Sequence, residues 1–182
     1  MPFQPILYIP PGRKDAARRL PVVKISAIAH SKQPHREGGF TNHWCLHLQT
    51  GNRFWDSAVL VDMSPSHTEP STVLRGGSKG HLLVSVLEPS PLAQDAEKVV
   101  SVQPREGLCV ADVVDALLQA GRHKYEFDAD GVGCRSWVTG SLSLLQSLCS
   151  GSSEDFEEAK AAILKLWPDG TDNPLDQGAY YE

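Results

Sequence analysis

The sequence predicts an α+β protein in which an antiparallel sheet of about five strands is followed by helices. Alternating apolar segments, typical of strands, fill the chain up to about residue 103. Apolar residues spaced by three and four, typical of helices, occur only after that point. Strands that come first and helices that come last favour an antiparallel sheet over a parallel α/β arrangement.

Length and composition favour one ordinary globular domain. The chain has 182 residues, 41% of them hydrophobic, which is enough to bury a core. The net charge of −5 argues against nucleic acid as a partner. No apolar run reaches the roughly 20 residues that cross a bilayer, and residues 1–4 carry no basic residue of the kind that opens a signal peptide. Four cysteines are too few for a disulfide scaffold, so we expect a cytoplasmic protein without a membrane partner.

Residues 1–21 differ in composition from the rest of the chain. Prolines and basic residues alternate there, which predicts an extended N-terminal arm rather than a folding unit. Residues 22–182 are expected to form the single α+β domain.

Five segments carry the strand pattern. Gly51-Asn52 predicts a hairpin between the second and the third of them, and the Pro- and Gly-containing residues 64–80 predict a loop. The five segments are residues 22–29, 42–48, 53–63, 81–87 and 98–103.

Three later segments carry helical patterns, and a short edge strand is expected at residues 125–127 before the second of them. The first helix covers residues 108–118 and ends at Gly121. The second begins near Cys134 and carries an apolar stripe to Cys149. The third starts after a serine cap at residue 152 or 153 and reaches residue 166.

The segment Asn42-His43-Trp44-Cys45-Leu46-His47 is the first candidate for chemistry. Because residues two apart in a strand share a face, the two histidines and Cys45 are expected to point together. Trp44 and Leu46 then point to the opposite, apolar side. A half-exposed strand anchored by Trp44 would show the same pattern.

The segment Gly131-Val132-Gly133-Cys134-Arg135-Ser136-Trp137 is the second candidate. Its glycines allow a sharp turn, so that Cys134 falls in the first turn of a helix. The positive end of a helix dipole favours a thiolate, and an imidazolium nearby would add to this effect. A cysteine that merely packs in the core is the alternative interpretation.

A helix that opens with a cysteine and packs on an antiparallel sheet presenting a histidine resembles papain-like thiol enzymes. Because the histidine strand precedes the cysteine helix, the resemblance is to the circularly permuted branch with NlpC/P60-like, lecithin:retinol-acyltransferase-like and PPPDE-type enzymes. From about residue 22 onward, the chain also resembles a fungal family of small proteins with no known activity. The blocks that carry this second resemblance are His30-Ser31, Asn42-His43-Trp44, Val61-Asp62-Met63, Tyr125-Glu126-Phe127 and residues 131–137.

The leading hypothesis is a cysteine-dependent hydrolase or transferase of acyl groups. Cys134 is the expected nucleophile and His43 the expected general base and acid. Asp62, on the next antiparallel strand, is the first choice for the residue that orients His43; His47 and Asp56 are the alternatives.

We expect a small-molecule or peptide substrate and no cofactor. Arg135 could bind a substrate carboxylate, or it could pair with Asp128 or Asp130. The other side chains expected near the substrate are Asn42, Trp44, Tyr125 and Trp137.

Three other hypotheses remain open at this point. The same pocket could bind a small molecule or promote a cyclisation without a covalent intermediate. The protein could be an interaction module without chemistry. A zinc site could form from His43, Cys45, His47 and Cys134, although no CxxC or HExxH spacing is present.

Overall fold

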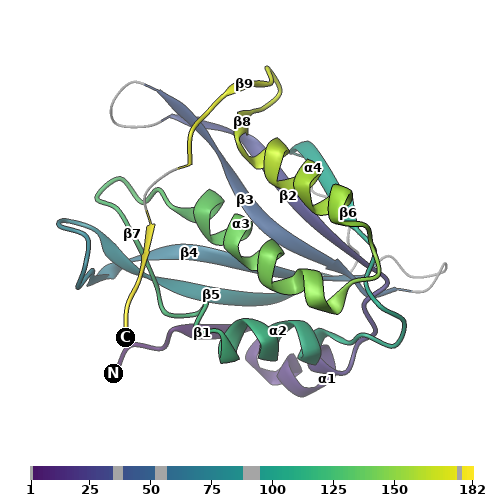
Figure 1. Ribbon diagram of the computed structural model, residues 1–182. Helices are drawn as coiled ribbons and strands as arrows, with labels where there is room; N and C mark the ends of the chain where they lie inside the picture. The colour runs from purple at the N-terminus through teal and green to yellow at the C-terminus, as the bar shows by residue number, and fades with distance from the viewer. Residues whose placement is uncertain (1, 35–38, 52–56, 88–94, 176–177) are drawn as a thin grey trace.

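A curled, largely antiparallel sheet forms the framework of the protein, seen in a computed structural model that describes residues 2–34, 39–51, 57–87, 95–175 and 178–182 (Figure 1). The strands follow the order β10-β7-β5-β4-β3-β2-β6, and β1 pairs with β5 in parallel beside this path. Their bounds are β1 (Ile6–Ile9), β2 (Lys24–Pro34), β3 (Phe40–Gln49), β4 (Ala58–Pro70), β5 (Ser78–Leu87), β6 (Ala96–Val102), β7 (Tyr125–Phe127) and β10 (Gly178–Tyr180).

The predicted α+β class and antiparallel sheet are confirmed, but the sheet has more than the expected five strands. The five predicted segments became β2 to β6, which lie side by side in the order β5-β4-β3-β2-β6. The short β1 and β10 were missed because three or four residues are too few to show an alternating pattern. Residues 64–80 are not all loop, because β4 runs on to Pro70 and β5 begins at Ser78.

The helices lie across one face of the sheet, with α3 along its middle (Figure 1). No helix of the described residues is long and apolar enough to cross a membrane. The bounds are α1 (Lys14–Arg18), α2 (Val110–Gln119), α3 (Cys134–Leu145) and α4 (Ser153–Ile163), with single 3-10 turns η1 (Pro11–Arg13) and η2 (Gln146–Leu148) and a two-stranded ribbon of β8 (Lys165–Leu166) and β9 (Thr171–Asp172).

The core lies between the sheet and these helices. Trp44, Leu46 and Leu48 of β3 belong to it, as the alternation predicted, and they pack with apolar residues of α2, α3 and α4. The first 21 residues, expected to be an arm, contribute β1 to the sheet and bury Ala17 of α1. Two residues that the sequence analysis mentioned, Asn52 and Asp56, lie outside the described residues.

The ladder between β3 and β4 is short, and this feature shapes the site. Its pairs run from Gln49–Ala58 to Leu46–Val61, while β3 stays paired with β2 as far as Phe40. Beyond Leu46 the two strands separate, and the first turn of α3 lies at this separation (Figure 1).

The backbone at Gly77, just before β5, packs closely against the end of β7, from which the chain turns toward α3. A Cβ atom at this position would lie 2.0 Å from the carbonyl oxygen of Phe127, at the end of β7. Backbone cannot yield as a side chain can, so Gly77→Ala is expected to lower the free energy of unfolding by about 1–3 kcal/mol. Gly12→Ala is the matched control, because nothing lies within 4 Å of the added carbon. Urea denaturation measures both, and equal stability of the two variants would contradict the packing.

Candidate functional site

A cavity of about 260 Å³ lies where β3 and β4 separate. The end of β2, the start of β3, the turn before α3 and the first residue of α3 form its walls. The lining residues are Gln33, Pro34, Thr41, His43, Asp130, Gly131, Val132 and Cys134. The two side chains that the sequence singled out for nucleophile and base therefore face one space.

Cys134 is placed by the turn that precedes it. Gly133 has φ 155°, in the region that favours glycine, and the buried Tyr125 hydroxyl donates a 2.8 Å hydrogen bond to its carbonyl. The backbone N–H of Trp44 points at the Cys134 sulfur at 3.5 Å, and the thiol faces the Asn42 carbonyl at 4.0 Å. The sulfur thus interacts with β3 beyond the last β3–β4 pair, at the first residue of α3.

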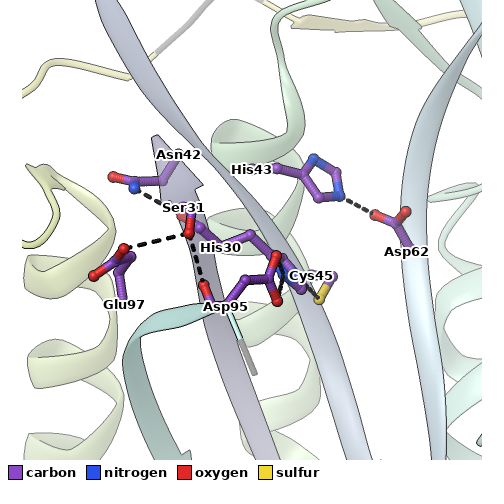
Figure 2. A network of polar contacts seen from close by, with 8 residues as sticks. All are labelled: His30, Ser31, Asn42, His43, Cys45, Asp62, Asp95 and Glu97. Atoms are coloured by element: carbon purple, nitrogen blue, oxygen red, sulfur yellow. Dashed lines mark hydrogen bonds and ion pairs between the residues drawn. The ribbon is translucent and has the colours of Figure 1, made fainter. Parts of the chain in front are cut away.

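His43 lies on the opposite face of β3 from Trp44 and is held by β4. Its Nε2 is 2.7 Å from Asp62 Oδ1 (Figure 2). The other carboxylate oxygen of Asp62 accepts a 2.6 Å hydrogen bond from the Ser64 hydroxyl. Because Asp62 engages Nε2, the nitrogen that can exchange a proton with another group is Nδ1.

The charges around His43 favour its protonated form. Burial by itself would lower the pKa of His43, but the hydrogen bond with Asp62 and the interaction with Cys134 raise it well above its ordinary value. Burial likewise opposes ionisation of Asp62, yet its bond with His43 lowers the pKa of the carboxyl group. An imidazolium between a carboxylate and a thiol is the pairing that thiol nucleophiles use.

The fourth predicted catalytic residue, His47, does not join this group. It lies inside the ladder, opposite Ser26 of β2 and Leu60 of β4, and burial lowers its pKa. The alternative Asp56 lies outside the described residues. Asp62 is therefore the carboxylate that the structure brings to His43.

Arg135, predicted to contact the substrate, is not among the residues that line the cavity. Its side chain is fully buried, and Nε and Nη2 donate to the Ile163 carbonyl at the end of α4. The guanidinium also donates to the carbonyls of Asn173 and Pro174. It therefore ties α3 to α4 and to the segment after β9.

The other four residues predicted near the substrate are also absent from the cavity lining, and their described contacts are within the fold. Trp44 and Trp137 are fully buried in the core, and the Trp137 indole N–H donates to the Arg122 carbonyl. Asn42 donates to the carbonyls of His30 and Trp167 and accepts a hydrogen bond from the Trp167 N–H. Tyr125, as described above, holds Gly133.

Sequence reasoning missed the polar residues that line the cavity and those around His43. Gln33, Thr41 and Asp130 carry no local signal, because they stand in turns and at strand ends. His30 and Asp95, which lie close to His43, were also missed. His30-Ser31 had been noticed only as part of a family resemblance, without a role.

The four-ligand zinc arrangement is not formed. Cys45 contacts His30 rather than His43, and His47 lies further along the strand. Among the described residues, no group of three or more His, Cys, Asp or Glu side chains is arranged to hold a metal ion.

Asp62→Asn is expected to destabilise the protein in a pH-dependent manner. The raised pKa of His43 adds stability that is present below its unfolded value and is lost as the pH rises through its folded value. The lowered pKa of Asp62 adds stability that is lost as the pH falls through its folded value. Between these two values the pair is charged, and the variant should lose roughly 1.5–3 kcal/mol in urea denaturation near neutral pH.

The loss should shrink as the pH rises through the pKa of His43. Asp172→Asn removes a carboxylate from an exposed ion pair with Lys165, so it serves as the control and should change little at any pH. A constant loss for Asp62→Asn across the alkaline range would show that the pair is not coupled.

The comparisons with known proteins identify a family but no activity. Residues 25–181 match the family described as a domain of unknown function (DUF7770). No curated protein and no solved structure matches the chain. Since the matched segment covers most of the sequence, including the whole cavity, the chain belongs to the DUF7770 family.

Proposed function

We propose that the protein is a cysteine-dependent hydrolase or transferase of acyl groups. The observation that carries this proposal is that Cys134 and His43 line one cavity while Asp62 holds His43 at 2.7 Å. A thiol, an imidazole and a carboxylate that orients the imidazole form the arrangement that cysteine nucleophiles need. The raised pKa of His43 adds support, because it keeps an acid available beside the sulfur.

The chemistry follows from these positions. The Cys134 thiolate attacks the acyl carbon, and the electron pair of the carbonyl moves to oxygen beside the positive end of α3. The tetrahedral intermediate collapses, and the leaving amine or alcohol takes the proton from His43 Nδ1. Water or another acceptor then attacks the thioester and gives its proton to Nδ1, and the thiolate leaves. Asp62 keeps Nε2 engaged throughout.

The cavity favours a small acyl group without a negative charge. Its volume of about 260 Å³ lies just below the range for drug-sized ligands. No lysine or arginine is among the described residues that line it, and Arg135 is directed to α4. Thr41, Gln33 and Asp130 offer polar groups suited to a neutral or cationic substrate. The acyl part of an amide, a peptide or an ester would suit this space.

The order of the site along the chain also supports the proposal. A histidine strand followed by a helix that opens with cysteine is the order expected from the resemblance to circularly permuted papain-like enzymes. The resemblance to small fungal proteins favours a substrate from small-molecule metabolism. These two likenesses guide the choice of substrate class; the cavity carries the proposal.

An activated ester tests the proposal directly. With p-nitrophenyl acetate, we expect release of p-nitrophenol together with one acetyl group on Cys134, located by peptide mass spectrometry. Cys134→Ala should abolish the acetylation, and His43→Gln should slow it by on the order of 100-fold or more, the range for general acid–base catalysis. Cys149→Ala, which removes a half-buried thiol outside the cavity, should leave the rate unchanged.

Two results would count against the enzyme. If Cys45 or Cys109 carries the acetyl group in place of Cys134, the nucleophile is assigned wrongly. If folded His43→Gln reacts as fast as the natural protein, the imidazole has no part in the reaction, and a binding role for the cavity becomes the better account.

A further inference from the structure

His30 stands in a bulge of β2 beside the proposed catalytic histidine. The register of β2 against β3 shifts between Ala29 and Lys32, and its register against β6 shifts between Ala29 and His30. The carbonyl of His30 accepts a 2.8 Å hydrogen bond from the buried Asn42 side chain. Bulges redirect side chains and are frequent next to active sites. This bulge therefore has a partner that stabilises it.

The imidazole of His30 is held at both nitrogens. Its Nδ1 lies 3.1 Å from each carboxylate oxygen of Asp95, and its Nε2 lies 3.3 Å from the Cys45 sulfur (Figure 2). Cys45 is fully buried, and burial raises the pKa of its thiol well above its ordinary value, so the sulfur carries its proton. With the thiol protonated, both contacts are satisfied when the thiol donates to Nε2 and Nδ1–H donates to Asp95.

Asp95 is itself fixed by neighbouring groups. The Ser31 hydroxyl lies 3.3 Å from both the Asp95 carbonyl and a carboxylate oxygen of Glu97 (Figure 2). The hydrogen bond from His30 lowers the pKa of Asp95, which keeps that carboxylate an acceptor. The His30 ring of β2 is thus held between Asp95, just before β6, and Cys45 of β3.

The face of that ring lies against His43. The two ring centroids are 5.8 Å apart and the planes are inclined by 29°. Asp62 contacts only the Nε2 edge of the His43 ring. A neighbouring ring held at both nitrogens restricts the orientations that the His43 ring can adopt against it.

We infer that His30, locked by Cys45 and Asp95, is a positioning residue that orients the His43 ring toward Cys134. This inference rests on the proposed function, because it gives His30 a role in the reaction assigned to His43 and Cys134. Cys45 then acts as a hydrogen-bond donor and not as a second nucleophile.

Variants at His30 and Cys45, assayed with p-nitrophenyl acetate, test the inference. His30→Ala and Cys45→Ala are each expected to slow acetylation of Cys134 about tenfold, the lower range for partners that act through another residue. Cys45→Ser should restore the rate, because its hydroxyl can donate to Nε2 in place of the thiol. His81→Ala is the control, since its Nδ1 contacts the Gln4 carbonyl near the N-terminus, outside the cavity.

A second measurement follows the ring of His43 itself. The NMR resonances of the His43 imidazole should move in His30→Ala and in Cys45→Ala and return in Cys45→Ser, because the stacked ring is lost or displaced and then restored. Circular dichroism and thermal melting show whether each variant folds.

The outcomes separate this inference from the proposed function. Unchanged rates and unmoved His43 resonances in folded His30→Ala and Cys45→Ala would overturn the positioning role while leaving the enzyme intact. If His30→Ala fails to fold, the comparison of Cys45→Ala with Cys45→Ser tests the positioning role instead. A slow Cys45→Ala and a restored Cys45→Ser support that role, and equal rates in both overturn it. If the natural protein takes up no acetyl group, the proposed function fails, and the His43 resonances alone support or overturn the positioning of the ring.

Discussion

The separation of β3 from β4 beyond the Leu46–Val61 pair is the constraint on which the site depends. A strand that loses its neighbour exposes backbone N–H and C=O groups that need other partners. The Cys134 thiol meets this need at two points, because it lies against the Trp44 N–H and the Asn42 carbonyl. The position of the sulfur is thus part of the sheet's hydrogen bonding.

The same separation explains how residues from two faces meet. Cys134 belongs to the helix side of the sheet, whereas His43 stands on the other side of β3 from Trp44. A continuous ladder would keep them apart. Where β4 diverges from β3, the Asp62 side chain of β4 still reaches His43 of β3. Its hydrogen bond holds His43 at the edge of the cavity.

Much of the polar chemistry in this region is structural. The Arg135 guanidinium donates hydrogen bonds to the carbonyl at the end of α4. The Asn42 amide donates to carbonyls of β2 and of the segment after α4, and so joins them. Leaving such buried groups unpaired would cost more than the bonds add, so these residues are fixed in the fold and cannot turn to a ligand. What remains open to a ligand in this region is a small cavity lined by a thiol, an imidazole, the Asp130 carboxylate and neutral polar groups.

Local patterns predicted the elements of the fold better than the contacts of the site. The helix that begins at Cys134 and the neighbouring strands of His43 and Asp62 were visible, because periodicity and hairpin order depend on nearby residues. The burial of Arg135 could not be predicted from the sequence, because its hydrogen-bond partners lie 28 to 39 residues away and reach it only when the chain packs. The bulge at His30 likewise depends on β3 and β6 together.

An NMR titration of His43 in the natural protein and in Cys134→Ala tests the central claim most directly. If the thiol and the imidazole interact across the gap, the pKa of His43 lies above its ordinary value of about 6.5 and falls when the sulfur is removed. The Asp62 hydrogen bond keeps part of the elevation in the variant. A His43 pKa that is the same with and without the Cys134 sulfur would contradict a thiol–imidazole pair and, with it, the proposed enzyme.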